Sequence, residues 1–468
     1  MDITFTSLID AANGVLWTYI LVAMLIGCAI WFTIRCKLVQ ITMLRDIPTI
    51  FRNCTHKEKE PGVESISSFQ AFAISIASRV GTGNLAGVAV AITLGGPGAV
   101  FWMWLIAFLG ASSAFVESTL AQLYKVRGES SFIGGPAYYM SMGLKKPWMG
   151  VIFSLLLIFT FGFAFNSVQS NTICQAFEEA FSIPPAYMGT VLTLLTAVII
   201  FGGIQSIAKV SSIIVPFMAL GYIALALVII AMNITEIPNV LSLIISHAFG
   251  WEQGLAGGIG AAIQQGIRRG LYSNEAGMGS APNVAATADV SHPVKQGKVQ
   301  AISVFSDTLI ICSCTAFIIL VGGIPAGSDV NGIKLTQAAL CQHIGPWGNI
   351  AVAVSIFFFA FSSVLGNYYY GEANVQYLSK KPWILLVYRL IVVAMVLFGS
   401  VASLSLVWNL ADLFMGLMTI CNLIAIVLLG KYAFRLLEDY RAQKRNGVED
   451  PVFTKESMPD IADDLKYW

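Results

Sequence analysis

Long apolar runs follow one another along most of the chain and are separated by short polar or basic segments. A helix of about 20 apolar residues is long enough to cross the hydrocarbon core of a bilayer. Divided at polar positions and at Pro/Gly clusters, the runs predict eleven transmembrane helices, which begin near residues 15, 66, 98, 148, 186, 208, 253, 299, 347, 383 and 407. The pattern therefore predicts an all-α polytopic membrane protein embedded in a lipid bilayer.

The positions of lysine and arginine give these predicted helices an orientation. Basic residues follow every odd-numbered helix, and Arg268 and Arg269 are counted with the group at the end of the seventh. Only Lys334 falls in a loop on the other side. Because short basic loops stay in the cytoplasm, we expect a multi-pass protein of the plasma or inner membrane, with an extracytoplasmic N-terminus and a cytoplasmic C-terminus. The first residues lack a basic n-region, so no removable signal peptide is expected.

The helices divide into an N-terminal unit and two blocks of five. Residues 1–65 hold the first helix and a basic segment, 37–53, which suits either an amphipathic interfacial helix or an ordinary cytoplasmic loop. Residues 66–235 and 253–432 form the two blocks, which run in opposite directions because five is an odd number. An extracytoplasmic loop, 236–252, separates the blocks, and a charged cytoplasmic tail, 433–468, is expected to be partly disordered.

Each block opens with a helix that glycines interrupt. In the first block Val80-Gly81-Thr82-Gly83-Asn84 breaks an apolar run, and in the second we place the break between Gly257 and Gly270. Lipid offers backbone groups no hydrogen-bond partner, so a transmembrane helix unwinds only where protein, water or a solute takes over. Paired breaks in two inverted halves indicate a secondary transporter with its site at the repeat interface.

The first break also fits two other patterns. Residues 81–86 match the G-x-G-x-x-A pattern of dinucleotide sites, but they lack a preceding strand and an acidic residue about 20 positions later. Gly83 and Gly87 have the G-x-x-x-G spacing of packed transmembrane helices. Packing alone is the alternative to a binding site, although it does not require the polar residues Thr82 and Asn84.

An unwound helix offers partial charges of both signs. Free N–H groups at the positive end of a half-helix suit a carboxylate, and released carbonyls suit a small hard cation such as sodium. One break can therefore hold an anion and a cation together. A zwitterionic amino acid beside a sodium ion matches this arrangement.

The fourth predicted helix carries an unusual polar run. Asn166, Gln169 and Ser170 share one helical face by their three- and four-residue spacing. We expect this face to line the substrate site, with Phe165 as a wall. The alternative is a set of interhelical hydrogen bonds worth about 0.6 to 2 kcal/mol each.

Four ionisable residues, Arg79, Glu117, Asp307 and Arg389, fall within predicted helices and toward their cytoplasmic half. Charges at membrane depth are costly unless they are paired or hydrated. We expect Arg79, Glu117 and Asp307 to form an inner gate whose ion pairs, including one between Arg79 and Asp307, break when the cytoplasmic path opens. For Arg389, snorkelling to the interface is the alternative.

Two longer motifs resemble signatures of a known family. The segments GGPGAVFWMW (residues 95–104, continuing to Gly110) and SNEAGMGSAP (residues 273–282) are similar to hallmarks of the alanine or glycine:cation symporter family. The resemblance extends from Gly14 to about Leu429. It implies a LeuT-type fold, with two inverted five-helix repeats and one extra N-terminal helix, and the import of small neutral amino acids with sodium.

The resemblance also implies which residues bind sodium. The carbonyls of Ala77 and Val80 and the hydroxyls of Ser362 and Ser363 would form the sodium site. Asn84 matches the position of a second sodium ligand in some relatives, and use of a single ion is the alternative that the resemblance leaves open.

For the amino acid, the resemblance implies that the backbone amides of Thr82 and Gly83 hold the carboxylate. The expected acceptors for the ammonium group are carbonyls released by the second break together with one side-chain amide: Gln264, Gly266, Ile267 and Gln169.

These predictions describe sodium-driven import by alternating access. Alanine or glycine is the expected substrate, and glutamine is an alternative. Proton coupling stays open, although the proposed cation site consists of carbonyls and hydroxyls and no midplane carboxylate stands out. A channel would also use exposed carbonyls, but the paired breaks favour a carrier.

Composition narrows the class further. Hydrophobic residues make up 56% of the chain and charged residues 11%, against roughly 25% charged residues in soluble domains. The predicted helices offer neither a nucleophile with a base nor clustered metal ligands, so no enzyme, organic cofactor or nucleic-acid partner is expected. The sequence leaves the oligomeric state open.

Overall fold

The computed structural model describes residues 5–47, 67–128, 131–250, 258–323 and 332–468. Within these ranges the chain is mostly helical, and the one hairpin consists of β1 (Val126–Arg127) and antiparallel β2 (Phe132–Ile133). Eight of the described helical segments are long and apolar enough to cross a membrane, and two shorter apolar helices cover Gly83–Gly95 and Pro185–Ile200. The expected all-α polytopic class is confirmed, whereas the count of eleven crossings is not.

The N-terminal half begins with one long helix in two segments, α1 (Phe5–Val15) and α2 (Val22–Arg35), joined by a π-helical stretch. The short helix α3 (Val39–Thr42) follows, and residues 48–53 of the predicted interfacial segment lie outside the described residues. The other helices of this half are α5 (Ser68–Arg79), α6 (Val88–Gly95), α7 (Ala99–Leu123), α8 (Pro136–Tyr138), α9 (Pro147–Leu157), α10 (Asn166–Phe181), α11 (Pro185–Ile200) and α12 (Gly203–Met232).

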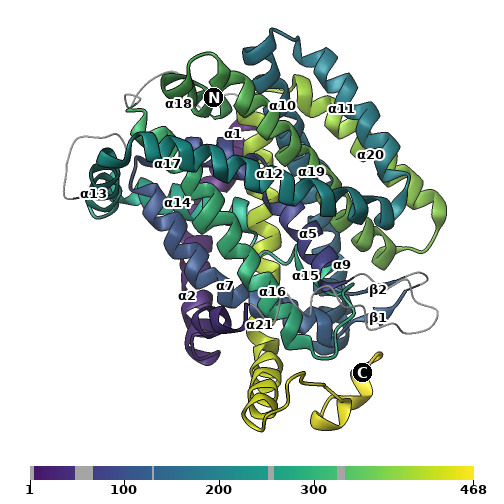
Figure 1. Cartoon of the computed structure of the whole chain (residues 1–468). Helices are drawn as coiled ribbons and strands as arrows, with labels where there is room; N and C mark the ends of the chain where they lie inside the picture. The colour runs from purple at the N-terminus through teal and green to yellow at the C-terminus, as the bar shows by residue number, and fades with distance from the viewer. Residues whose placement is uncertain (1–4, 48–66, 129–130, 251–257, 324–331) are drawn as a thin grey trace.

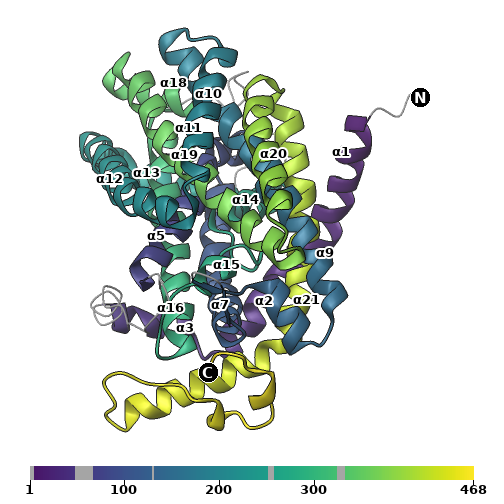
Figure 2. The same cartoon turned by 90° about the vertical axis from the view of Figure 1, so that its right-hand side faces the viewer.

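The C-terminal half contains the longest helices of the described chain, α19 (Trp347–Leu378) and α21 (Leu404–Arg445). α21 continues well beyond residue 432, where the second block was expected to end. Figures 1 and 2 show the N-terminus and the C-terminal segment at opposite ends of the molecule. The other helices of this half are α13 (Ile237–Ala248), α14 (Gly258–Asn274), α15 (Pro282–Ala285), α16 (Pro293–Val304), α17 (Ser313–Val321), α18 (Ile333–Ile344) and α20 (Pro382–Val401).

Small residues bring helices of the two halves into close contact. Every residue of α7 from Gly110 to Leu123 is buried, and α7 packs against α14 and α16. At Gly297 of α16, a Cβ atom would lie 2.1 Å from Thr119 Oγ1 and 2.9 Å from the Phe115 carbonyl oxygen of α7. Close approach through small residues is typical of helices that pack within a bilayer.

The C-terminal tail is ordered, so the prediction of partial disorder is wrong. After α21 the chain turns back under the helices, as the yellow segment of Figure 2 shows. The Phe453 N–H donates to the Ser291 carbonyl at 2.8 Å, and the Trp468 indole N–H donates to the Gln122 carbonyl at 3.0 Å. The Lys125 ammonium lies 4.8 Å from the centre of the Trp468 ring, and this cation–π contact helps to hold the tail.

Candidate substrate and cation site

The first predicted break is confirmed, because α5 ends at Arg79 and helical structure resumes at Gly83. In a continuous helix the Gly81 N–H would donate to the Ala77 carbonyl. Here it donates to Asn84 Oδ1 at 2.9 Å, and the Asn84 N–H donates to the Gly81 carbonyl at 3.2 Å. The carbonyls of Ala77 and Val80 thereby lose their helical partners and become available as ligands.

The four predicted sodium ligands converge at this break. Ser363 Oγ, on α19, donates to the carbonyls of Ala77 at 3.0 Å and Val80 at 3.3 Å. Ser362 Oγ lies 3.4 Å from the Ala77 carbonyl oxygen. Gly81 permits this approach, because a Cβ atom there would lie 2.2 Å from Ser363 Oγ. All four candidate ligand atoms are oxygens, which suits a sodium ion.

Thr82 and Gln169 meet beside the same break. The backbone N–H and the hydroxyl of Thr82 both donate to Gln169 Oε1 of α10, at 2.9 and 2.6 Å. This side-chain oxygen occupies an acceptor position that a carboxylate oxygen can also take. Gly83 lies against α14, since a Cβ atom there would lie 3.1 Å from the Ser273 Cα atom.

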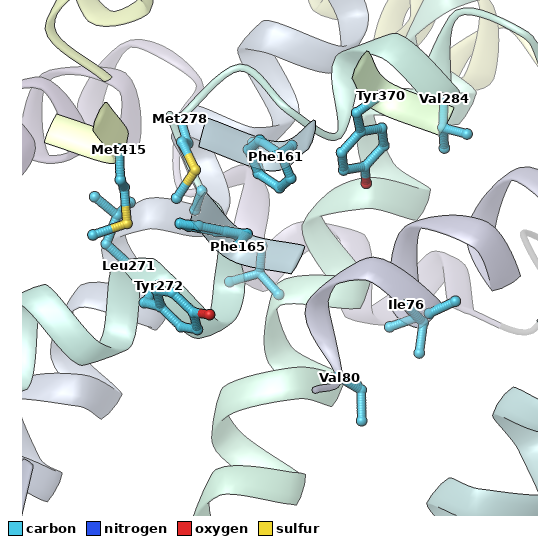
Figure 3. Packing of buried hydrophobic residues seen from close by; sticks show 14 of the residues in the cluster. Ile76, Val80, Phe161, Phe165, Leu271, Tyr272, Met278, Val284, Tyr370 and Met415 are labelled. Carbon is cyan, nitrogen blue, oxygen red and sulfur yellow. The ribbon is translucent and has the colours of Figure 1, made fainter. Parts of the chain in front are cut away.

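Aromatic side chains line the region between the broken helices. The ring centres of Phe161 and Phe165 are 4.7 Å apart, those of Phe165 and Tyr272 are 4.4 Å apart, and those of Tyr272 and Trp408 are 4.7 Å apart. Figure 3 shows Phe165 between Phe161 and Tyr272, with Val80 on the neighbouring broken helix. The Tyr272 hydroxyl is buried and finds no hydrogen-bond partner within the described part of the chain. The expected wall at Phe165 is therefore one member of a larger aromatic row.

The predicted position of the second break is wrong. α14 is continuous from Gly258 to Asn274, so the carbonyls of Gln264, Gly266 and Ile267 are not released, and Gly257 lies outside the described residues. Gly266 and Gly270 serve helix packing: an added Cβ atom would lie 2.4 Å from the Ala99 carbonyl oxygen of α7 at Gly266 and 2.7 Å from Ile106 Cγ2 of α7 at Gly270. Glycine content alone therefore did not distinguish packing from unwinding.

The second broken helix unwinds between α14 and α15, over residues 275–281. Glu275, Gly277 and Gly279 have φ angles of +56°, +84° and +87°, a region that favours glycine. The polar run Ser273-Asn274-Glu275 followed by two spaced glycines was the sequence signal for this break. It lies inside the second motif that carried the family resemblance.

Glu117, which was expected in an inner gate, lies at this second break and accepts hydrogen bonds from its backbone. Its Oε1 accepts from the Gly277 N–H at 3.1 Å, and its Oε2 accepts from the Gly279 N–H at 3.0 Å and from Asn422 Nδ2 at 2.8 Å. The side chain is fully buried in α7. The carboxylate thus satisfies backbone donors that unwinding leaves free.

Asp307, the other carboxylate of the expected gate, also lies at the breaks. Its Oδ1 accepts from Asn84 Nδ2 at 2.7 Å, and its Oδ2 accepts from Ser273 Oγ at 2.7 Å and Thr308 Oγ1 at 2.9 Å. Sequence analysis singled out this carboxylate but not its partners, because Asn84 and Ser273 come from two other helices.

Glu275 forms a second bridge between the broken helices. Its carboxylate accepts from Ser78 Oγ of α5 at 3.0 Å and from Ser280 Oγ at 2.5 Å. Together with Asp307, it places two buried carboxylates between the two breaks.

The predicted ion pair between Arg79 and Asp307 is not formed. The Arg79 guanidinium donates to the Gln300 carbonyl at 3.3 Å and to Ser303 Oγ, and no carboxylate of the described residues lies within 4.0 Å of it. Arg389 pairs with Glu372 at 3.3 Å, so it is held by an ion pair. Of the four charged residues, Glu117 and Asp307 therefore lie at the breaks, whereas Arg79 and Arg389 hold contacts between other helices.

Comparison with known proteins identifies the family. A family model described as "Sodium:alanine symporter family" matches residues 1–455. The chain belongs to this family. The probable sodium/glutamine symporter GlnT of Bacillus subtilis (strain 168) is 52% identical, with 96% of this chain and 94% of that protein covered. The sodium/alanine symporter AgcS of Methanococcus maripaludis is 40% identical, with 91% of this chain and 95% of that protein covered.

A solved structure supports the fold. The chain superposes on the crystal structure of MhsT in complex with L-phenylalanine with a TM-score of 0.55 and 14% identity, over 87% of this chain and 94% of that one. This likeness concerns the fold alone and agrees with the expected LeuT-type architecture. As a member of the sodium:alanine symporter family, the protein is a transporter and not an enzyme, as the sequence predicted.

In this symporter family member, a further cluster of charged side chains lies along α14, before the second break in the chain. Arg268 and Arg269 lie 2.5 and 2.7 Å from Asp412 Oδ2 of α21. Their expected place at the cytoplasmic end of the seventh helix is wrong, because both lie inside α14. The Arg269 guanidinium also stacks 4.3 Å from the ring centre of Trp408, so the cluster closes one end of the aromatic row.

Proposed function

We propose that this protein imports small neutral amino acids, alanine or glycine, in symport with sodium. The observation that carries the proposal is the convergence of the Ala77 and Val80 carbonyls with the hydroxyls of Ser362 and Ser363, beside the Thr82 amide. Membership of the sodium:alanine symporter family supports the same function. Asn84 holds this break open through Gly81.

The amino acid binds at the first break with its carboxylate on the N–H groups of Thr82 and Gly83, at the positive end of the following half-helix. Gln169 Oε1 then leaves Thr82 and accepts from the substrate ammonium group. The last carbonyls of α14, which the second break releases, replace Gln264, Gly266 and Ile267 as further ammonium acceptors. Phe165 and Tyr272 bound the side-chain space.

The chain crosses the membrane eleven times, with α5–α6 and α14–α15 as the two broken crossings of inverted blocks 66–235 and 253–432. The N-terminus is extracytoplasmic and the C-terminus is cytoplasmic, which agrees with their positions at opposite ends of the molecule (Figure 1). On this orientation Arg268, Arg269 and Asp412 lie on the outer side of the site and act as an outer gate. Arg79 lies on the inner side.

Transport proceeds by alternating access, and sodium entry drives it. An inside-negative potential contributes about 2.3 kcal/mol per charge per 100 mV. Asp307 provides a second place for a cation, because its carboxylate, Ser273 Oγ and the Asn84 side chain meet there. A proton on Asp307 is the alternative occupant, and one relative is named a sodium/proton-dependent alanine carrier protein.

A second candidate substrate is glutamine. The relative with 52% identity to this chain is named a probable sodium/glutamine symporter. The amide of glutamine would have to fit beside Phe165 and Tyr272, where the ring centres are 4.4 Å apart.

Uptake by the purified protein in proteoliposomes tests the function. Radiolabelled alanine, glycine and glutamine are supplied with and without an inward sodium gradient, at equal pH on both sides. We expect saturable uptake that requires sodium. Equal uptake in its absence would contradict sodium symport, and uptake that Asp307→Asn converts from pH-dependent to pH-independent would assign a proton to that carboxylate.

A further inference from the structure

A basic pocket lies at the end of the molecule that carries the C-terminal segment, away from the helix breaks. Its volume is about 650 Å³, and it is formed by α16, α21 and the segment between α2 and Asp46. Three separate stretches of sequence therefore contribute to it. Six of its lining residues are basic: Lys37, Arg45, Lys298, Arg441, Lys444 and Arg445.

Positive charge in this pocket exceeds the negative charge that lines it. Asp46 and Glu438 are the acidic residues of its wall. Asp46 pairs with Lys298, and Glu438 lies 3.7 Å from Lys37. The four remaining cations have no carboxylate within 4.0 Å among the described residues.

The geometry of the pocket suits a phosphate group. Arg441 is held in place by donating to the Cys36 carbonyl at 3.1 Å and to Thr42 Oγ1 at 3.2 Å, so its guanidinium is ordered without a carboxylate. Arginine side chains bind phosphate oxygens through paired N–H donors, and lysine adds point charge. Basic residues at the end of a helix such as α21 also favour its dipole, but that effect does not explain Arg45 and Lys298, which come from other elements.

The wall next to this pocket is apolar and exposed. Leu38, Ile41 and Leu44 alternate with the pocket residues along the same short segment, and each is 46% exposed. Ile34, at the end of α2, is 67% exposed. An apolar strip beside a basic pocket is the arrangement that a membrane interface favours, with acyl chains on the strip and headgroups in the pocket.

We propose that this pocket binds the phosphate-bearing headgroup of an anionic phospholipid of the adjacent leaflet. The headgroup lies among Arg45, Arg441, Lys444 and Arg445, and the acyl chains lie along Leu38 and its neighbours. Bound lipid thereby ties α2 and α3 to α16 and α21. This site is independent of the amino-acid site.

Binding of lipid to the full-length protein in mixed micelles tests the proposal. The probes are fluorescent phosphatidylglycerol and fluorescent phosphatidylcholine with the same acyl chains. We expect saturable binding of phosphatidylglycerol that weakens as salt screens the charges, and no saturable binding of phosphatidylcholine. Equal affinity for both lipids would overturn the proposal.

A charge-removal variant with a matched control locates the site. Arg45→Gln combined with Arg445→Gln removes two exposed cations of the pocket, whereas Lys380→Gln combined with Lys381→Gln removes two exposed cations of the α19–α20 connection. We expect the dissociation constant for phosphatidylglycerol to rise about thirtyfold in the pocket variant and less than about twofold in the control. Equal changes in both variants would show that general surface charge binds the lipid.

Competition with soluble phosphates distinguishes a lipid headgroup from a free phosphate ester as the ligand of the pocket. Inorganic phosphate and glycerol 3-phosphate compete for the pocket in the same assay. We expect neither to displace phosphatidylglycerol at millimolar concentration, because neither contacts the apolar strip. Displacement by glycerol 3-phosphate at micromolar concentration would assign the pocket to a soluble phosphate ester and overturn the lipid assignment. Native size-exclusion profiles confirm that every variant is folded.

Discussion

The two broken helices are stabilised in different ways. At the first break, the Gly81 N–H finds its partner in Asn84, three residues later in the chain. At the second, the N–H groups of Gly277 and Gly279 find theirs in Glu117, which is 160 and 162 residues away in sequence. The Gly81 N–H is thus compensated locally by a neutral amide, although the Thr82 N–H reaches Gln169 of α10, whereas the two glycines of the second break are compensated remotely by a buried carboxylate.

This difference explains why one break could be located from sequence and the other could not. A short window around Gly81 contains both the unwound residues and Asn84, whose side chain accepts from the Gly81 N–H. No window around Gly277 contains Glu117, so the glycines of α14 offered an equally good local signal. A membrane helix can unwind only where other groups take over the hydrogen bonds of its backbone. At the second break those groups come from another helix.

Among the variants that test this comparison, removal of the Glu117 carboxylate is expected to have the largest effect on stability and uptake. Glu117→Ala leaves two backbone N–H groups and the Asn422 amide without their acceptor in a buried site. We expect the free energy of unfolding to fall by about 3 to 5 kcal/mol and uptake to be abolished. Thermal unfolding followed by tryptophan fluorescence measures the first effect.

The control for this variant is Glu178→Ala, which removes an exposed carboxylate from α10. It should leave the unfolding temperature unchanged. A similar small loss in both variants would mean that Glu117 does not stabilise the second break.

Replacement of a glycine in the second break has the next largest effect. At Gly279 the φ angle is +87° and a Cβ atom would lie 2.8 Å from Asn422 Cγ. We expect Gly279→Ala to cost about 2 to 4 kcal/mol through backbone strain and overpacking and to abolish uptake. Gly221→Ala in α12, where a Cβ atom meets nothing within 4 Å, is the control and should be neutral or stabilising. Normal uptake by Gly279→Ala would show that the second break does not require a glycine at this position.

The local amide of the first break has a smaller effect on folding than on transport. Asn84→Ala removes one acceptor from the Gly81 N–H and one donor to Asp307. We expect the free energy of unfolding to fall by about 1 to 3 kcal/mol, with uptake at limiting sodium reduced at least about tenfold. The sodium dependence of uptake measures the second effect. A stability loss as large as that of Glu117→Ala would contradict the distinction between local and remote compensation.

The smallest expected effect is the difference in sodium dependence between variants of the two hydroxyls at the candidate cation site. Ser363 Oγ reaches both the Ala77 and Val80 carbonyls, whereas Ser362 Oγ reaches only that of Ala77, at 3.4 Å. We expect Ser363→Ala to raise the half-saturating sodium concentration about tenfold and Ser362→Ala about twofold to threefold. Equal shifts, or an unchanged sodium dependence in both variants, would argue against the assigned geometry. The ratio of maximal rates for alanine and glycine serves as the internal reference.

Much of the architecture could be predicted because membrane helices leave local signals. The class, the first break, the convergence of Ala77, Val80, Ser362 and Ser363, and the placement of Gln169 and Phe165 follow from apolar runs, an isolated polar pentapeptide, or a family motif. The role of the four oxygens as sodium ligands stays a prediction. The pairing expected for the gate residues Arg79 and Asp307 was wrong for a physical reason. A charge inside a predicted helix is recognisable, but its partners are not, and Glu117 and Asp307 bind backbone and amide groups from distant helices.

The hydroxyls of Ser362 and Ser363 have a consequence for the ion-free protein. Each hydroxyl carries one hydrogen, which can point to a carbonyl that we assign to sodium or to the Phe359 carbonyl, 2.9 Å from Ser362 Oγ and 3.1 Å from Ser363 Oγ. The hydrogens can therefore turn to the Ala77 and Val80 carbonyls when the ion leaves. They can turn to the Phe359 carbonyl when an incoming cation takes the lone pairs of the hydroxyls.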